Sequence, residues 1–248
     1  MKMDLSIVIA AYNEKENIGR LIEALNKICK ENKINNEIII VDDSSPDGTS
    51  GVILEYKKRD KNIMLISRPP KSGIGSAYGD GVKSSRGIVI ITMDADFSHS
   101  PSALVEMYRK AKEGYIVSGS RFLKKGGFST KFYRKIGTTL LNLWIRTLFN
   151  TGIKDHTNGY IAVNKENLNK IIKRGIEKRS FPFKKTLYGI PIFAIAKVFG
   201  FKVCEVFAPY KFREVGETKI NFFDGLSIVL NDSWYAFKLF FRLKNDKF

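Results

Sequence analysis

Three apolar runs, each leading into polar residues, constrain the fold of this 248-residue chain more than any other feature. They read LSIVIAAY, EIIIVDD and GIVIITM, and turn-forming or helical patterns separate them. Strands that are apolar along their whole length are buried on both faces, which is typical of parallel sheets covered by helices. The alternation predicts one α/β domain with a Rossmann-like, mostly parallel sheet and helices on both faces.

Helical and strand periodicity extends this pattern along the chain. Helices are expected over residues 17–34, 49–59, 101–113, 130–150 and 186–199, and a further helix is entered through the Gly-rich stretch at residues 73–85. Further strands are expected within residues 63–67, 115–120, 159–163 and 201–210. We expect residues 1–220 to form the main domain. Residues 221–248 should form an amphipathic helical extension of this domain. No linker separates two folding units, so we expect a single domain with this extension.

Charge is distributed unevenly between the two halves of the chain. Residues 1–120 carry 17 Lys and Arg against 16 Asp and Glu, whereas residues 121–248 carry 25 against 9. A one-sided basic field indicates an anionic partner, which could be phosphate groups, nucleic acid or an anionic membrane surface. No recognised nucleic-acid-binding motif is present, so we expect no nucleic-acid partner. A merely Lys-rich, solvated surface is the alternative.

Neither end of the chain reads as a membrane-spanning segment. The short N-terminal apolar run follows Asp4 and lacks a cleavage-site pattern, so it favours a first strand over a signal peptide. The C-terminal run INFFDGLSIVLNDSWYAFKLFFRL is interrupted by Asp224, Asn231, Asp232 and Lys238, which suits an amphipathic surface helix. Cys29 and Cys204 are expected to be reduced core residues.

Two aspartates one residue apart follow the third apolar run, in TMDADFSHSP. In an extended segment the side chains of Asp94 and Asp96 point the same way, and their like charges repel unless a cation lies between them. Aspartate oxygens suit Mg²⁺ or Mn²⁺, and Mg²⁺ is commonly held by one or two carboxylates plus substrate phosphates. The pair therefore suggests a divalent metal and a diphosphate. A solvated turn is the alternative.

Two further loops carry patterns of nucleotide sites. In VDDSSPDGT, Asp42 or Asp43 could accept hydrogen bonds from a base or ribose, although the same residues could simply cap a helix. The stretch SGIGSAYGDG is similar to a phosphate-binding loop but lacks the GK[ST] of a P-loop. His99 and His156 lie in site-like loops, where a hydrogen-bonding role is favoured over catalysis.

Taken together, six segments resemble the inverting family 2 glycosyltransferases of the GT-A fold, and most of all the dolichol-phosphate mannose synthases. These segments are IAAYNEKENI, IIIVDDSSPDGT, SGIGSAYGDGV, IITMDADFSHSP, VSGSRF and DHTNGY, within a resemblance that covers about residues 4–220. The resemblance implies transfer of a sugar, most often mannose, from a nucleotide diphosphate donor such as GDP-mannose. The implied acceptor is a polyprenyl or dolichyl phosphate.

The resemblance also assigns residues to roles, motif by motif. Ala11, Tyr12, Glu14 and Asp43 would line the nucleotide pocket, and Asp94 and Asp96, with Ser98 nearby, would hold the metal on the donor diphosphate. Arg121 would reach the phosphates, Arg134 and Thr138 would bind the acceptor phosphate, and Arg213 and Lys219 would close over both sets of phosphates. Among these, Asp96 and Arg213 are implied to be catalytic.

The chain departs from the family pattern near the expected sugar pocket. Ile161 stands where Arg is common, Gly189 and Pro191 replace Gln and Glu, and Asn158 replaces Ser. A phosphate acceptor needs no general base to remove a proton, because near pH 7 it is mostly a dianion. A saccharide acceptor and a nucleotide-sugar-binding paralogue with weakened catalysis are the alternatives.

The basic second half and its aromatic helices suggest a position at a membrane. Trp144, Trp234 and Tyr235 lie in apolar stretches beside Lys and Arg, a combination typical of interfacial helices. We expect a cytoplasmic protein held peripherally at the inner face of a membrane, without a transmembrane helix. The alternative is that these aromatic stripes are simply core.

Overall fold

The structure is a computed structural model that describes residues 3–70, 72–125, 127–177, 188–210 and 222–244, with residues 222–224 described by their backbone alone. Arg213 and Lys219 lie outside the described residues. The strands are β1 (Leu5–Ala11), β2 (Asn36–Asp42), β3 (Ile63–Ser67), β4 (Val89–Asp94), β5 (Ile116–Ser120), β6 (Ile161–Asn164) and β7 (Val203–Phe207).

The strands form one seven-stranded sheet in the order β3-β2-β1-β4-β6-β5-β7. All neighbours pair in parallel except β6, which is antiparallel to both β4 and β5. The three apolar runs become the central strands: Ile7 on β1 lies between Ile38 on β2 and Ile91 on β4. The predicted mostly parallel sheet is confirmed, and the reversed strand β6 is an addition to it.

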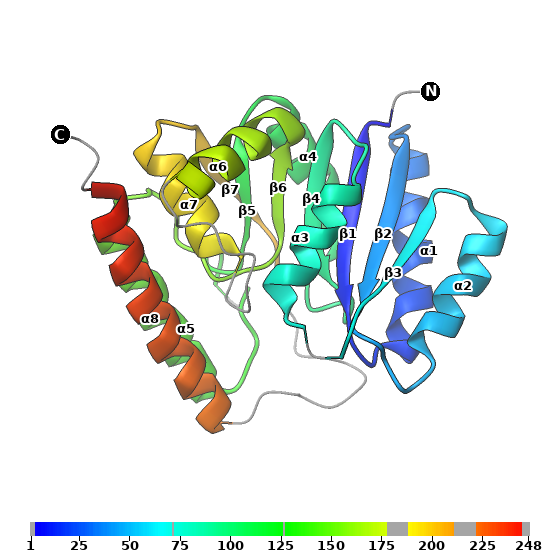
Figure 1. Cartoon of the computed structure of the whole chain (residues 1–248), viewed down its shortest axis with the longest axis horizontal. Helices are drawn as coiled ribbons and strands as arrows, with labels where there is room; N and C mark the ends of the chain where they lie inside the picture. Colours follow the sequence, from blue (N-terminus) through cyan, green and yellow to red (C-terminus); the bar gives the residue numbers. More distant parts are fainter. Residues whose placement is uncertain (1–2, 71, 126, 178–187, 211–221, 245–248) are drawn as a thin grey trace.

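Helices cover both faces of the sheet (Figure 1). They are α1 (Lys15–Glu31), α2 (Thr49–Arg59), α3 (Ile74–Ser84), α4 (Leu104–Lys112), α5 (Phe132–Phe149), α6 (Lys165–Glu177), α7 (Gly189–Val198) and α8 (Phe222–Lys244), with a 3₁₀ turn, Pro101–Ala103, before α4. One core cluster joins α1, α2 and α4 to one face, and a second joins α3 and α5–α8 to the other. These two layers follow from strands that are apolar on both sides.

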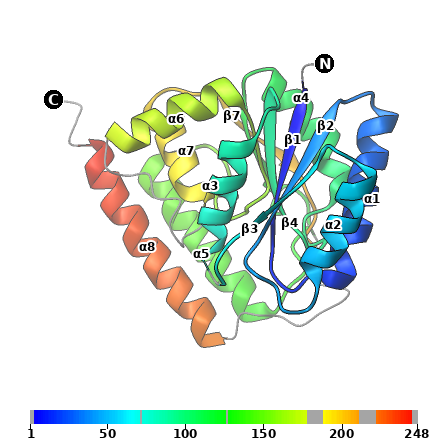
Figure 2. The ribbon, with the colours of Figure 1, turned by 45° about the vertical axis from the view of Figure 1, so that its right-hand side comes forward.

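The last helix packs beside α5 at one end of the sheet, as both ribbon views show (Figures 1 and 2). Phe149 on α5 meets Phe240 on α8 edge to face with ring centroids 5.9 Å apart. Nearer the start of both helices, the Trp144 indole N–H donates to the Ser233 carbonyl at 3.4 Å. Because residue numbers increase together along these contacts, the two helices run in the same direction.

Candidate active site

The loops that follow β1, β2 and β4 meet at the lower edge of the sheet in Figure 1. Each contains one non-glycine residue with left-handed backbone: Asn13 (φ 53°), Ser44 (φ 52°) and Phe97 (φ 59°). Such conformations cost free energy and gather where a loop must hold a functional geometry. In open α/β sheets, ligands bind outside the carboxyl ends of the strands. This edge is therefore the candidate site.

The β1 and β2 loops are tied together by hydrogen bonds. The Asp43 N–H donates to the Ala11 carbonyl at 3.3 Å, and the Glu14 N–H donates to the Thr49 hydroxyl at 2.9 Å. Glu14 is buried and accepts a hydrogen bond from the Asn17 side-chain amide at 2.9 Å. The structure thus brings together the residues predicted for the nucleotide pocket, including Tyr12 between Ala11 and Glu14.

The two adjacent aspartates of β2 have different tasks. Asp42 is fully buried and accepts from the Ser45 N–H at 3.2 Å and the Ser50 hydroxyl at 2.5 Å, so it organises its own loop. Asp43 instead contacts the residue before α3, since its Oδ2 accepts the Gly73 N–H at 3.2 Å. Its role as a nucleotide contact stays a prediction.

Asp43 is held by an arginine that the sequence motifs did not single out. Arg68 follows β3, is buried, and donates through Nε and Nη2 to Oδ1 of Asp43 at 2.9 and 2.5 Å. Through Nη1 it also donates to the Ser76 hydroxyl at 2.9 Å and to Asp80 at 3.1 Å. Arg68 therefore fixes the Asp43 carboxylate and the first turns of α3 as one unit. The Arg-Pro-Pro sequence gave no pattern that marks this role.

Asp94 and Asp96 lie where β4 ends and its loop begins. The Ser98 N–H donates to Oδ1 of Asp96 at 3.0 Å, and the Ser98 hydroxyl is buried without a hydrogen-bond partner among the described residues. Two carboxylates and an unsatisfied hydroxyl oxygen form an oxygen-only donor set, which is the chemistry of Mg²⁺ and Mn²⁺ sites. The described part of the chain holds no group of three or more His, Cys, Asp or Glu that could bind a metal. The pair therefore suits a metal that takes further ligands from a substrate.

Each oxygen of Asp94 faces a side chain from another element. The Tyr78 hydroxyl on α3 donates to Oδ1 at 2.6 Å, and Nε2 of His99 lies 3.8 Å from Oδ2. The Asp94 N–H donates to Nδ1 of His99 at 3.0 Å, which leaves the proton of a neutral imidazole on Nε2. Burial, and then the Asp94 charge, raise the pKa of Tyr78 well above its ordinary value, so its hydroxyl stays a donor. His99 has the loop role predicted for it.

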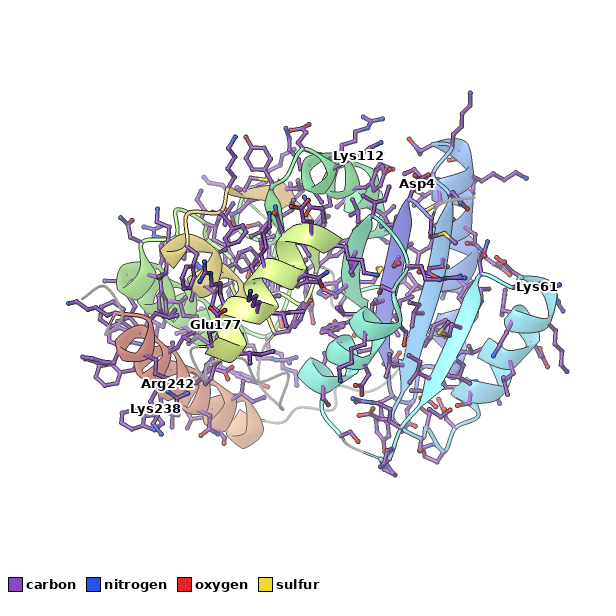
Figure 3. The ribbon with its side chains drawn as sticks, turned by 45° about the horizontal axis from the view of Figure 1, so that its top comes forward. Asp4, Lys61, Lys112, Glu177, Lys238 and Arg242 are labelled. Carbon is purple, nitrogen blue, oxygen red and sulfur yellow. The ribbon has the colours of Figure 1, made fainter. Side chains whose placement is uncertain are left out.

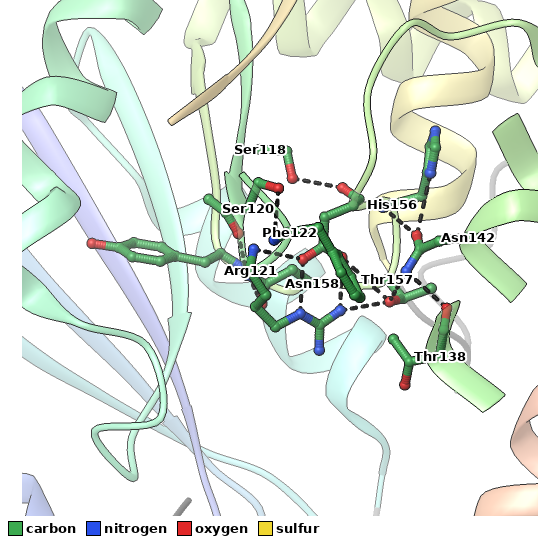
Figure 4. Close-up of polar contacts among 12 residues, drawn as sticks. Ser118, Ser120, Arg121, Phe122, Thr138, Asn142, His156, Thr157 and Asn158 are labelled. Carbon is green, nitrogen blue, oxygen red and sulfur yellow. Dashed lines mark hydrogen bonds and ion pairs between the residues drawn. The ribbon is translucent and has the colours of Figure 1, made fainter. Parts of the chain in front are cut away.

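Arg121, at the end of β5, is anchored to the loop before β6 (Figure 4). It donates to Asp155 through Nε at 2.7 Å and through Nη2 at 2.7 Å, and Nη2 also donates to the Thr157 hydroxyl at 2.7 Å. Burial would raise the pKa of Asp155, but the Arg121 charge and hydrogen bonds outweigh it and hold that pKa below its ordinary value. The ring of Phe128 lies 4.6 Å below the guanidinium.

A second set of hydrogen bonds joins this loop to α5. The Asn142 amide donates to the Thr138 carbonyl at 3.0 Å and to the Thr157 hydroxyl at 3.1 Å, and its carbonyl accepts the His156 N–H at 2.7 Å (Figure 4). His156 also contacts the Thr151 hydroxyl at 2.6 Å, and burial lowers its pKa to about 4. His156 therefore lies in the loop as a hydrogen-bonded residue, in line with the role expected from the sequence.

A cavity of about 520 Å³ connects these groups to helices α5 and α8. Its polar lining includes Asp94, Arg121 and Arg134, together with Thr138, so one of the predicted metal residues shares this space with the predicted acceptor residues, whereas Asp96 and Ser98 are not part of the lining. Most of its apolar lining comes from α3, α5 and α8, and the loop before β6, Tyr188 and Tyr210 complete it. The lining side chains that are also exposed at the surface are Ile74, Ile136, Leu140, Leu226 and Ile228. The cavity therefore opens onto an apolar part of the surface.

The positions that depart from the family pattern are packing positions. Ile161 on β6 is buried in the core and pairs with Thr92 on β4. A Cβ at Gly189 would lie 2.4 Å from the His156 carbonyl oxygen, so glycine lets the buried start of α7, including Pro191, approach this loop. Asn158 donates to the Gly119 carbonyl. Of these four, only Asn158 is among the described residues that line the cavity.

Helices α5 and α8 expose an unusual number of large apolar side chains, here called the α5–α8 apolar surface. It consists of Phe132, Ile136, Leu140, Leu143, Trp144, Leu226, Ile228, Leu230, Trp234, Phe237 and Phe241. Lys238 and Arg242 extend from α8 into solvent, as Figure 3 shows. Within the described ranges, no helix is long and apolar enough to cross a membrane.

Asp232, next to this surface, is a buried carboxyl group whose hydrogen bonds are incomplete. It lies on α8 with only 2% of its surface exposed, and its Oδ2 has no hydrogen-bond partner among the described residues. Burial raises its pKa to about 7. In the sequence Asp232 interrupts an apolar run, and in the structure it is buried.

Comparison with known proteins gives matches in sequence over most of the chain. The family model described as "Glycosyl transferase family 2" matches residues 6–179. The polyprenol monophosphomannose synthase of Mycolicibacterium smegmatis is 31% identical over 221 residues, which cover 87% of this chain and 80% of the relative. The dolichol-phosphate mannosyltransferase of Pyrococcus furiosus is also 31% identical, over 88% of this chain and 60% of the relative, so this chain spans three fifths of that protein's length.

Solved structures with the same fold are more distant in sequence. Glucosyl-3-phosphoglycerate synthase from Mycobacterium tuberculosis, in complex with Mn²⁺, uridine diphosphate and phosphoglyceric acid, has a TM-score of 0.63 at 17% identity, over 97% of this chain and 78% of that one. Mannosyl-3-phosphoglycerate synthase from Rubrobacter xylanophilus has a TM-score of 0.61 at 15% identity, over 99% and 75%. These two likenesses concern the fold alone.

Proposed function

Because this chain belongs to glycosyl transferase family 2, we propose that it transfers mannose from GDP-mannose to a polyprenyl phosphate, such as dolichyl phosphate. The two curated relatives are named for mannose transfer to lipids of this class. Glycosyl transfer follows from the family. The particular donor and acceptor are the proposal.

The observation that carries the proposal is the cavity between the sheet edge and helices α5 and α8. Asp94, Arg121 and Arg134 make one part of its lining charged, while α5 and α8 make the rest apolar. A ligand that suits both parts has an anionic head and a hydrocarbon tail. A polyprenyl phosphate has this composition, whereas a saccharide would leave the apolar lining without a partner.

On the donor side, we assign the nucleoside to Ala11, Tyr12, Glu14 and Asp43. The donor diphosphate would lie beside Asp94, Asp96 and Ser98, which would hold Mg²⁺ or Mn²⁺. When bound, the metal would stabilise the negative charge that develops on the leaving diphosphate. The solved mannosyltransferase of Pyrobaculum calidifontis, with a TM-score of 0.53 at 17% identity, was crystallised with GDP-mannose and Mn²⁺.

On the acceptor side, we assign the phosphate to Arg134 and Thr138 at the start of α5. The second pKa of the acceptor phosphate is about 6, so near pH 7 it is mostly a dianion. One of its oxygens can therefore attack the sugar without a general base. That oxygen forms a bond to the anomeric carbon as the bond from this carbon to the diphosphate oxygen breaks, and the configuration inverts. Asp155 balances the charge of Arg121, so Arg121 offers an oriented hydrogen-bond donor to the leaving diphosphate.

Two predicted cationic residues, Arg213 and Lys219, lie outside the described residues. In the proposal they close over the donor and acceptor phosphates, as the family resemblance implies. Arg213 would then stabilise charge on the leaving group, and its removal should lower kcat. This assignment is independent of the cavity described above.

We also propose that the α5–α8 apolar surface rests on the cytoplasmic face of an anionic membrane. The second half of the chain carries the excess of Lys and Arg, and Lys238 and Arg242 flank the exposed aromatic side chains of α8. This arrangement is typical of interfacial helices. Residues 221–248 would then be a membrane-facing extension, and the lipid tail could pass between cavity and bilayer.

The test is transfer of labelled sugar by the purified full chain with Mg²⁺ or Mn²⁺. GDP-mannose, UDP-glucose and UDP-N-acetylglucosamine are each paired with a polyprenyl phosphate and with an oligosaccharide. We expect transfer from GDP-mannose to the lipid phosphate, and loss of transfer with EDTA. Transfer only to the oligosaccharide would replace the proposed acceptor. Nucleotide-sugar binding without any transfer would instead indicate a paralogue with weakened catalysis.

A further inference from the structure

We propose that Tyr78 is a positioning residue for the metal site, holding Asp94 in the orientation that binds the divalent ion. This inference rests on the proposed metal-dependent function. Tyr78 lies on α3, outside both acidic loops, and its hydroxyl donates to Oδ1 of Asp94 at 2.6 Å. It is a short hydrogen bond to a carboxylate, which is stronger than one between neutral groups.

The position of the Tyr78 ring leaves it little freedom. Only 1% of the residue is exposed, and its ring packs against that of Tyr188 with centroids 5.3 Å apart. On the other side, Gly159 makes room for it, since a Cβ there would lie 2.8 Å from the Tyr78 hydroxyl oxygen. A ring fixed by packing directs its hydroxyl to one place, and Asp94 is at that place.

Asp94 needs such a partner because of its neighbour. Asp96 follows two residues later, and the two carboxylates would otherwise repel one another in the absence of metal. The bond from Tyr78 occupies one side of Asp94, and His99 approaches the other oxygen to within 3.8 Å. Hydrogen-bond partners of metal ligands fix their orientation, and their loss typically weakens metal affinity about 10- to 100-fold.

Helix α3 also links the metal site to the nucleotide site. The Ser76 hydroxyl and Asp80 accept hydrogen bonds from Arg68, which holds Asp43, while Tyr78 reaches Asp94 from the same helix. A nucleotide that contacts Asp43 and restricts the motion of α3 therefore also restricts the motion of the Tyr78 hydroxyl. We expect metal and nucleotide to increase each other's affinity, and we expect this cooperativity to depend on Tyr78.

The experiment compares Tyr78→Phe with Tyr160→Phe in the full chain. Phenylalanine keeps the ring and removes only the hydroxyl. Tyr160 is a matched control, because it is fully buried and its hydroxyl has no hydrogen-bond partner among the described residues. Free Mn²⁺ is measured by electron paramagnetic resonance in titrations of each protein, with and without GDP, and thermal unfolding is followed in parallel.

We expect Tyr78→Phe to weaken Mn²⁺ binding in the presence of GDP by about 10-fold or more, and Tyr160→Phe to leave it unchanged. GDP binding without metal should be equal in all three proteins, and high Mn²⁺ should restore the transfer rate of Tyr78→Phe. Unchanged Mn²⁺ affinity in folded Tyr78→Phe would overturn the inference, as would equal weakening in both variants.

The outcomes also separate this inference from the proposed function. If the unaltered chain binds Mn²⁺ with GDP but transfers no mannose, the proposed substrates fail while the role of Tyr78 is still decided by the titration. If the unaltered chain binds no Mn²⁺ at all, the metal site and the inference fall together.

Discussion

The loops after β1, β2 and β4 differ from the α5–α8 pair in how their carboxylates are hydrogen-bonded and in how much apolar surface they expose. After β1, β2 and β4, carboxylates accept hydrogen bonds from named donors, such as Arg68 to Asp43 and Tyr78 to Asp94. Helices α5 and α8 instead leave apolar side chains in solvent and one buried carboxyl, Asp232, with an unsatisfied oxygen. The donor end is preorganised for a small charged ligand, and the helical end is suited to a larger apolar partner.

The largest effect should come from the ion pair on which Arg121 depends. Asp155→Asn removes the partner charge of a buried arginine, and breaking a buried pair in this way costs about 3–5 kcal/mol. Urea unfolding measures the loss. The control is Glu166→Gln, which breaks a solvent-exposed pair with Lys170 and should change the free energy of unfolding far less.

The free energy of unfolding at acid pH should depend on the same carboxyl group, that of Asp155. Because the folded chain holds the pKa of Asp155 below its ordinary value, the stabilisation is complete above the unfolded pKa near 4. It is lost as pH falls through the folded pKa, where the carboxylate gains a proton. The acid-induced loss of stability should be smaller in Asp155→Asn, and equal slopes would contradict the assignment.

The next effect concerns catalysis at the donor end. Asp96→Ala should lower the transfer rate by about 10²–10³-fold, the usual cost of losing one electrostatic contact to the transition state. GDP binding in EDTA should change little, because the proposed nucleoside contacts lie at the end of β1 and in the loops after β1 and β2. If Asp96→Ala keeps most of the transfer rate, Asp96 does not stabilise the transition state. The proposed contrast between a catalytic end at the sheet edge and an apolar end at α5 and α8 would then be wrong.

Asp232 provides a test of the helical end. The pKa of its carboxyl is raised to about 7, so the folded chain binds the proton more tightly than the unfolded chain, and stability should fall as pH rises from about 4 to 7. Asp232→Asn should remove this slope and raise the free energy of unfolding at pH 8 by about 1–3 kcal/mol. The neighbouring exposed change Asn231→Asp should alter neither quantity by a comparable amount.

The smallest expected effect is at the surface. Trp234→Ser should weaken sedimentation with vesicles that contain phosphatidylserine by about tenfold, since a large side chain contributes about 1.5–3 kcal/mol when it leaves water. Leu54→Ser removes a similarly exposed apolar side chain on α2, away from the α5–α8 apolar surface, and should have no effect. Equal effects of both changes would argue against a membrane-facing surface.

The sequence predicted the layers and most elements of the fold, because unbroken apolar strands and 3.6-residue periodicity reflect burial directly. It missed α6 and the reversed direction of β6. Strand direction depends on how the chain connects through space, and a four-residue strand carries no sign of it. The confirmed family and GT-A type of fold came from ordered motifs, which combine several short signals into a specific one.

The candidate site residues also divide into those that the sequence motifs identify and those that only the structure identifies. Asp94, Asp96 and Arg121 stand in motifs and could be found from the sequence. Arg68 could not, since a lone arginine after a strand is ordinary in folded proteins. Tyr78 stands in the segment SGIGSAYGDGV, but that segment suggested phosphate binding and gave its tyrosine no role. Their importance arises from side-chain directions that only the packed structure defines. The roles of Ala11, Tyr12 and the other predicted contacts stay predictions until ligands are measured.

The reversed strand β6 has a consequence for the order in which the molecule can be made. In the finished sheet β5 does not touch β4, because β6 lies between them. During synthesis, β1 to β4 can pair as they emerge, but β5 must wait for residues 161–164 before it can join. Arg121 likewise waits for Asp155, so the nascent chain exposes the edge of β4 over that interval. A synthesis pause after residue 120 should therefore leave this edge open to chaperones or to aggregation.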